Sequence, residues 1–269
     1  MKSLDDIKQD GWQSGIDQIW NCDCLEGMKY IPDNSIDMIL ADLPYGITAC
    51  KWDTIIPFEP LWEQYKKIIK DNGAIVLTGS EPFASFLRVS NIKMYKYDWI
   101  WEKSVGSNFA TLKYQPMKEH ESISIFGRRT LKYNPIKEER SKSGKERIKY
   151  GCRGGVTGEA TGKIKFKGST NCTYGNLRYP RSIQKFNNRE KCRGLHPTQK
   201  PVAMCEYFIK TYTNEGDLVL DNVIGSGTTA IACINTKRHF IGMEISREYC
   251  KISEARLSAT KFQGELELK

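Results

Sequence analysis

The sequence predicts an α/β protein built on one doubly wound, mostly parallel sheet that is interrupted by a basic insertion. Segments with strand and helix patterns alternate at both ends of the chain, which is typical of a parallel sheet covered by helices. The positive charge is concentrated in one central block, and two polar turns follow predicted strands. With 269 residues and 39% hydrophobic content, the chain can bury the core of one large domain.

Before the basic block, five strands and three helices are expected. Apolar residues from Leu61 to Ile69 recur at helical spacing, and Gly73 is the expected stop of that helix. Ser35–Ala41 is expected to be a buried strand that runs up to Asp42. The other expected strands are 16–20, 74–78, 97–101 and 122–126, and the other expected helices are 24–31 and 83–89.

After the basic block, strands and helices alternate again, so both ends of the chain are expected to contribute to the same sheet. The last helix has Ser246 at its start, a residue that caps helix N-termini well. The expected elements are a helix over 201–213, a strand over 217–221, a helix over 227–236, a strand over 239–242 and a helix over 246–260.

Residues 127–195 carry the whole positive excess of the chain. They contain 19 Lys and Arg against 5 Glu, a net charge of +14, whereas the rest of the chain is net −5. Such a block predicts a surface that binds a polyanion such as nucleic acid. Interleaved aromatic residues favour an ordered surface, and the alternative is a solvated insertion without a partner.

No segment predicts a membrane span or a secretory leader. The longest apolar runs are a few residues, far below the roughly 18 that a bilayer-spanning helix needs. Nine cysteines at irregular positions favour a reducing compartment, so the cytoplasm is the expected location and no membrane partner is expected. Cys152, Cys172 and Cys192 lack the close pairing of a zinc site, and no metal is expected.

A glycine-rich turn, Gly-Ser-Gly-Thr at 225–228, follows the expected strand that ends at Asp221. Its two glycines permit tight turning and close approach of a ligand to the N–H groups at the helix start. Glu244 follows the next strand, where a carboxylate can accept the hydroxyls of a ribose. Read alone, this pattern equally suits a nicotinamide-dependent dehydrogenase or a turn without a ligand. A triphosphate-binding loop is disfavoured because no lysine precedes Thr228.

A second polar turn, Asp42-Leu43-Pro44-Tyr45, follows the expected strand 35–41. It lies at the edge where doubly wound sheets place their ligands. Pro44 biases Leu43 toward an extended backbone, so that the Leu43 carbonyl is aimed. The Asp42 carboxylate and this carbonyl form two acceptors about one amino group apart, and the ring of Tyr45 can stack on a planar heterocycle. The turn is therefore predicted to hold the exocyclic amine of a base.

With these residues in place, the chain resembles the DNA adenine-N6 methyltransferases that use S-adenosylmethionine. The resemblance is to the permuted (beta) group, in which the catalytic motif comes first, the target recognition region second and the cofactor motif last. It covers most of the chain outside the basic block. The matching segments are 42–45 for the catalytic signature, 221–229 for the glycine motif, and 22–28, 101–103, 119–121 and 196–201 for lesser family features.

This resemblance implies a Rossmann-like methyltransferase that methylates N6 of an adenine flipped out of double-stranded DNA. It implies a catalytic half over 1–126, a target recognition insertion over 127–195 and a cofactor-binding half over 196–269. The implied catalytic residues are Asp42, Leu43, Pro44 and Tyr45. The implied cofactor-binding residues are Asp23, Thr198, Lys200, Asp221, Gly225, Ser226, Gly227, Thr228 and Glu244.

The chain departs from the family pattern at Leu43, which replaces a proline, and at Asn222 and Val223, which replace Pro and Phe. The alternatives left open are a cytosine-N4 DNA methyltransferase, typical when serine replaces the motif aspartate, and a DNA-binding homologue with weakened catalysis. A dehydrogenase would explain neither Asp42–Tyr45 nor the basic block. A homodimer and a cognate restriction endonuclease are further expectations from the resemblance.

Overall fold

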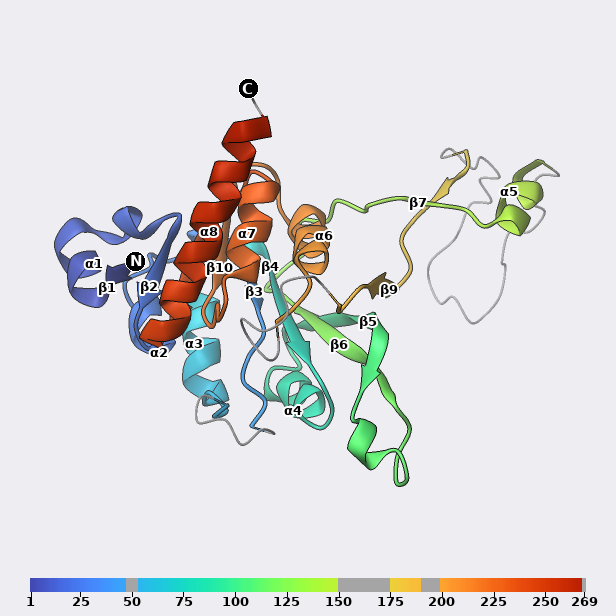
Figure 1. Cartoon of the computed structure of the whole chain (residues 1–269), viewed down its shortest axis with the longest axis horizontal. Helices are drawn as coiled ribbons and strands as arrows, with labels where there is room; N and C mark the ends of the chain where they lie inside the picture. The colour runs from blue at the N-terminus through green and yellow to red at the C-terminus, as the bar shows by residue number, and fades with distance from the viewer. Residues whose placement is uncertain (47–52, 150–174, 190–198, 268–269) are drawn as a thin grey trace. The chain divides into compact units, whose positions relative to one another are not determined.

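The computed structural model of the chain describes residues 1–46, 53–149, 175–189 and 199–267 (Figure 1). Its internal contacts divide it into two compact units. The first, the sheet unit, contains Met1–Asn134 and Ser182–Lys269, and the second contains Pro135–Arg181. The second unit falls within the basic insertion, whose boundaries at 127 and 195 stay a prediction.

The sheet unit is built on a mostly parallel sheet. Its described strands follow the order β1-β2-β11-β10-β3-β4-β6-β5-β9. Neighbours are parallel except β4 with β6 and β6 with β5. In sheet order the strands are Lys2–Ser3, Gln18–Asn21, His239–Glu244, Leu218–Asp221, Ile36–Ala41, Ile69–Gly79, Lys118–Phe126, Tyr95–Ser107 and Ile183–Phe186. The predicted fold class is therefore confirmed.

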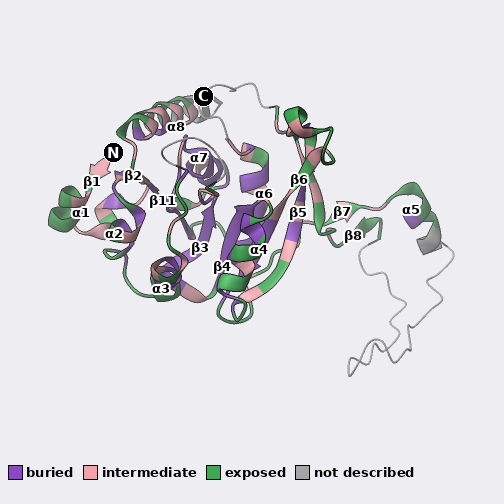
Figure 2. Cartoon of the chain, turned by 90° about the horizontal axis from the view of Figure 1, so that it is seen from below, coloured by how far each residue is buried: buried purple, intermediate pink, exposed green. Residues whose placement is uncertain are grey.

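Helices cover both faces of this sheet, and each face has its own apolar core (Figure 2). One core is formed with α1 (Leu4–Asp10), α2 (Cys24–Met28), α3 (Phe58–Ile68) and α4 (Phe83–Ser90). The other is formed with α6 (Val202–Tyr212), α7 (Thr228–Asn235) and α8 (Arg247–Glu267). Two short 3₁₀ helices, η1 (Trp12–Gly15) and η2 (Phe109–Thr111), complete the unit. Among the described residues, no helix combines the length and the apolarity that crossing a bilayer requires.

The second unit contains a short two-stranded sheet and a helix. β7 (Glu138–Glu139) pairs antiparallel with β8 (Leu177–Arg178), and α5 covers Lys142–Lys149. An ion pair of 3.1 Å between Arg178 Nη2 and Glu138 Oε2 links the two strands. The central part of the basic insertion, 150–174, lies outside the described residues, as do the three cysteines considered for zinc.

Most predicted elements overlap an observed one, but the role given to Gly73 is wrong. Helix α3 ends at Ile68 and β4 begins at Ile69, so Gly73 lies inside a strand. A Cβ atom at Gly73 would come within 2.8 Å of the backbone oxygen of Asp37 on the neighbouring strand. Glycine is therefore required by the close approach of β3 and β4, a contact that a local helix-stop rule does not consider.

The order of the central strands determines where the polar turns meet. β3 and β10 are parallel neighbours, with Val219 opposite Met38 and Leu220 opposite Ile39. On the other side of β10, β11 runs parallel to it and ends at Glu244. The turns that follow these three strands therefore lie at one edge of the sheet, where α/β proteins bind ligands.

Candidate active site

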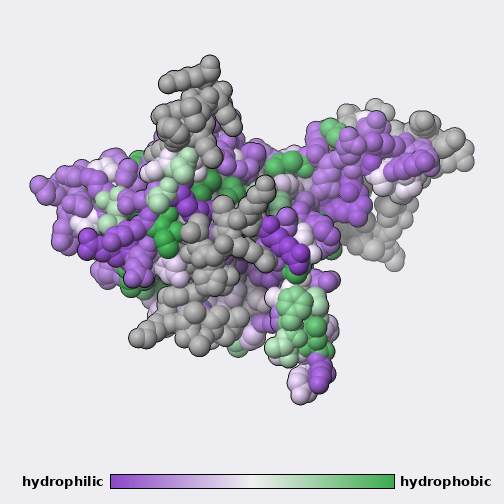
Figure 3. All heavy atoms as spheres, viewed as in Figure 1, coloured by the Kyte–Doolittle hydropathy of each residue, from purple (hydrophilic) through white to green (hydrophobic). Residues whose placement is uncertain are grey.

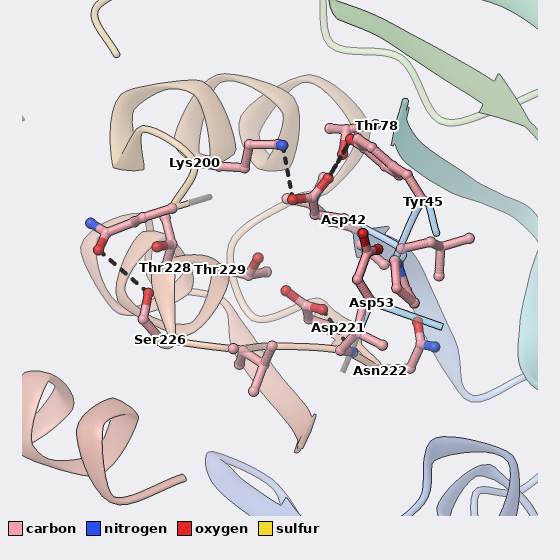
Figure 4. A pocket seen from close by; sticks show the side chains of 18 of the residues that line it. Asp42, Tyr45, Asp53, Thr78, Lys200, Asp221, Asn222, Ser226, Thr228 and Thr229 are labelled. Carbon is pink, nitrogen blue, oxygen red and sulfur yellow. Dashed lines mark hydrogen bonds and ion pairs between the residues drawn. The ribbon is translucent and has the colours of Figure 1, made fainter. Parts of the chain in front are cut away.

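A cavity of about 1080 Å³ opens at this edge, entirely within the sheet unit. Both predicted turns line it, one after β3 and one after β10 (Figure 4). The predicted site residues in its wall are Asp23, Asp42, Leu43, Pro44, Tyr45, Lys200, Asp221, Gly225, Ser226, Thr228 and Glu244. Gly227 lies just behind the wall as the N-cap of α7. Thr198 falls outside the described residues.

Asp42 is the centre of a polar cluster at the end of β3. Its Oδ1 accepts a hydrogen bond of 2.6 Å from the hydroxyl of Tyr45 and another from the hydroxyl of Thr78. Its Oδ2 forms an ion pair of 2.8 Å with Lys200 Nζ. Sequence reasoning missed Thr78, because its side chain reaches Asp42 only through the pairing of β3 with β4.

Lys200 belongs to a second buried ion pair that sequence reasoning did not predict. Its Nζ lies 3.1 Å from Glu121 Oε2, and Glu121 Oε1 lies 2.5 Å from Lys103 Nζ. Burial opposes ionisation of Glu121, but the two lysines outweigh it and lower the pKa of Glu121 to about 2. Burial alone would lower the pKa of Lys200, yet Asp42 and Glu121 raise it well above its usual value. Glu121 and Lys200 therefore both stay charged near neutral pH.

The ring of Tyr45 has two close neighbours, an aromatic ring and an ammonium group. It stacks on Phe83 with the ring centroids 4.9 Å apart, and Lys200 Nζ lies 5.6 Å from its centroid. Burial and the Asp42 carboxylate raise the pKa of the Tyr45 hydroxyl, which stays protonated and donates to Asp42. Stacking of Tyr45 on a flipped base stays a prediction, since its partner in this structure is Phe83.

The glycine turn is closed by the carboxylate of Glu244. Gly225 N–H donates to Glu244 Oε2 at 3.1 Å, and Ser246 N–H donates to Oε1 at 2.8 Å. Gly225 and Gly227 have φ values of +53° and +84°, a region that glycine adopts without strain. A Cβ atom at Gly227 would also lie 3.0 Å from the Cβ of Ser253 on α8. Both glycines therefore serve the shape of the turn.

Two further residues stabilise the segments around the cavity by hydrogen bonds to their backbones. Asp23 is the N-cap of α2 and accepts backbone N–H groups of Leu25 at 2.8 Å and Glu26 at 3.1 Å through Oδ1. Arg256 on α8 donates to the backbone oxygen of Ser226 at 2.5 Å and to its hydroxyl at 3.0 Å. Nothing in the sequence pattern of α8 distinguishes Arg256 from the other charged residues of that helix, so it was not predicted.

The departures from the family pattern are accommodated by packing. Leu43 is 3% exposed and belongs to the core on the α1–α4 face, which fixes the turn without a second proline. The side chain of Asn222 is held by α3, because its Oδ1 accepts a hydrogen bond of 2.6 Å from the hydroxyl of Tyr65. Val223 lines the cavity and packs against the same core, so it supplies an apolar surface next to the glycine turn.

Asp221 gives the structure a testable dependence on pH. Burial raises its pKa from 3.8 to about 7, so the folded protein holds a proton that the unfolded chain releases above about pH 4. Stability should therefore fall as the pH rises from 4 to 7. Asparagine resembles the protonated acid and keeps an oxygen for the Val223 N–H, now 3.1 Å from Asp221 Oδ1.

We expect Asp221→Asn to raise the free energy of unfolding at pH 8 by a few kcal/mol, because each unit of pKa shift corresponds to about 1.4 kcal/mol. At pH 4.5 the variant and the wild type should differ little. Urea denaturation at both pH values measures this, and an equal difference at the two values would contradict a raised pKa.

A doubly wound sheet with an acidic turn and a glycine turn around one cavity defines a Rossmann-like protein that binds a nucleoside at its strand ends. The chain belongs to the DNA methylase family, whose model matches residues 36–255.

Two curated relatives match over most of their length. The chain is 27% identical over 268 residues to the type II methyltransferase M.HpaI of Haemophilus parainfluenzae, which covers 93% of this chain and 76% of that protein. It is 27% identical over 270 residues to the DNA adenine methyltransferase YhdJ of Escherichia coli strain K12, with 91% and 84% covered.

Solved structures share the fold. The M1.HpyAVI–SAM complex has a TM-score of 0.61 and 22% identity, and the match covers 89% of this chain and 98% of that one. The cytosine-N4-specific PvuII DNA methyltransferase has a TM-score of 0.60 and 16% identity, with 88% and 84% covered.

Proposed function

We propose that this chain is an S-adenosylmethionine-dependent DNA methyltransferase that methylates N6 of adenine. The observation that carries the proposal is the common cavity: Asp42–Tyr45 and the turn at 221–229 line the same space, at a size that suits a nucleoside cofactor and a base. Membership of the DNA methylase family and the similarity to an adenine methyltransferase support it.

The cofactor side of the cavity fits S-adenosylmethionine by its hydrogen-bond acceptors. Three acidic side chains, those of Asp23, Asp221 and Glu244, lie in the wall. Their oxygens can accept hydrogen bonds from the hydroxyls of a ribose. Bound there, the cofactor would supply an electrophilic methyl group on a sulfonium. Ser226, Thr228 and the glycines would hold its methionine end.

The chain's own residues would activate the amine. The lone pair of an adenine amine is delocalised into the ring, and positive charge develops on the nitrogen as it reacts. Asp42 and the Leu43 carbonyl would accept its two hydrogens and stabilise that charge more than they stabilise the neutral amine. Before a base enters, Lys200, Tyr45 and Thr78 already donate to Asp42, so the amine has to share the carboxylate with these donors or replace one of them.

The order of the parts supports the permuted arrangement. The catalytic turn at 42–45 precedes the basic insertion, and the glycine turn at 225–228 follows it. In this proposal residues 1–126 form the catalytic half, 127–195 recognise double-stranded DNA through their positive charge, and 196–269 hold the cofactor. A homodimer and a cognate restriction endonuclease are part of the proposal by resemblance alone.

Sequencing of modified bases in DNA from cells that express the chain tests the proposal. We expect N6-methyladenine at one defined sequence, and a much lower level with an Asp42→Ala variant. Detection of N4-methylcytosine instead would show that cytosine is the substrate. Unmodified DNA would contradict the proposed methyltransferase activity. In the second case, calorimetry with S-adenosylmethionine would separate an inactive homologue that has lost the cofactor from one that still binds it.

A further inference from the structure

The hairpin formed by β5 and β6 ends in an exposed apolar tip. Between these strands, Phe109 is 60% exposed, Leu112 is 43% exposed and Tyr114 is 87% exposed. Figure 3 shows a hydrophobic area close to the end of the hairpin, next to a hydrophilic outermost point. Large apolar side chains that are grouped on the surface in this way usually mark a contact with a partner.

The tip has a defined internal structure. Asn108 adopts a left-handed conformation with φ of +64°, and its side chain ties the loop together. Its Oδ1 accepts the backbone N–H of Lys118 at 2.7 Å, while its Nδ2 donates to Thr111 Oγ1 at 3.1 Å and to the Pro116 oxygen at 3.2 Å. The polar groups of Asn108 are thus used in hydrogen bonds within the loop. The exposure of the rings is a property of this fold and is not caused by a lack of local structure.

The residues at which the tip begins and ends line the cavity of the candidate active site. Ser107, Asn108 and Lys118 are in the wall that also contains Asp42. The apolar tip therefore begins within a few residues of the space in which the target base would be held. Lys113 lies between Leu112 and Tyr114 in the sequence, is exposed and provides positive charge, which suits a phosphate backbone.

We propose that this tip is a wedge that enters the DNA duplex beside the target base pair and fills the gap left by the extruded base. An aromatic ring that stacks on a neighbouring base offsets the cost of unstacking, and apolar side chains inserted between base pairs are a known way to open a duplex. The proposal rests on the proposed function, because a wedge is needed only if a base leaves the helix.

The test compares two DNA substrates that differ in the cost of extruding the base. Both carry the recognition sequence found by sequencing; in one the target base is paired, and in the other it faces an abasic site. We expect Phe109→Ala/Tyr114→Ala to lower kcat/KM about tenfold or more on the paired substrate, which is the range of lost base stacking. On the abasic substrate the loss should be about twofold or less, because little stacking has to be replaced.

Phe86→Ala on α4 is the matched control, since Phe86 is 64% exposed and lies outside the cavity wall. It should behave like the wild type on both substrates. An equal loss on both substrates for the tip variant would overturn the wedge, and so would no loss on either. A loss accompanied by a changed sedimentation coefficient would assign the tip to contact with a second copy instead. If the wild type methylates neither substrate, the proposed function itself fails.

Discussion

Replacing Asp42 with alanine is expected to lower turnover by about 10²–10³-fold or more, the loss seen when one preorganised group that stabilises transition-state charge is removed. The carboxylate lies at the end of β3, and the residues assigned to the cofactor lie mainly in the glycine turn between β10 and α7 and at the end of β11. Binding of S-adenosylmethionine and DNA should therefore change little. Single-turnover methylation gives the rate, and calorimetry with fluorescence anisotropy gives the two affinities.

Asp42→Asn is the informative companion, because it keeps one oxygen acceptor and removes the charge. We expect a rate between those of the alanine variant and the wild type. Thermal unfolding of both variants controls for the loss of the ion pair with Lys200. Near wild-type turnover of the alanine variant in a folded protein would show that Asp42 does not activate the amine.

The central part of the fold was predictable because its signals are local. β3, β10 and β11 are short apolar segments bounded by polar turns, and sequence patterns alone predicted all three. The ends of the hairpin were not predicted, because the outer halves of β5 and β6 are mostly polar and have no apolar alternation. The prediction for Gly73 was wrong for a related reason. The requirement for glycine there comes from a neighbouring strand and not from its own segment.

In the site, too, the residues with a local sequence signal were predicted and their partners from distant segments were not. Asp42 and the glycine turn were found because each sits in a contiguous pattern at a strand end. The partners of Asp42 come from distant parts of the chain: Thr78 from β4 and Lys200 from the segment before α6. Such pairings arise only when strands and helices pack, so the resemblance assigned Lys200 to the cofactor, whereas its ion pairs in the structure are with Asp42 and Glu121.

Lys200→Met separates these two roles and is expected to have the second large effect. The side chain of Lys200 is 11% exposed, and methionine has a similar length without the charge. Removing one partner of a buried ion pair typically costs about 3–5 kcal/mol of stability. Lys103 remains on Glu121, so we expect the lower end of that range. Turnover should also fall, because Asp42 loses the group that orients its Oδ2.

If Lys200 acts through Asp42, Lys200→Met lowers kcat and leaves the affinity for S-adenosylmethionine unchanged. If it holds the methionine end of the cofactor, that affinity falls instead, which calorimetry detects directly. Lys103→Met is the matched control, because Lys103 is 10% exposed and also pairs with Glu121 but has no ion pair with Asp42. It should cost stability similarly and affect kcat less, while Lys200→Arg should recover part of the lost turnover. Equal loss of kcat in both methionine variants would assign the effect to the charge cluster as a whole rather than to the orientation of Asp42.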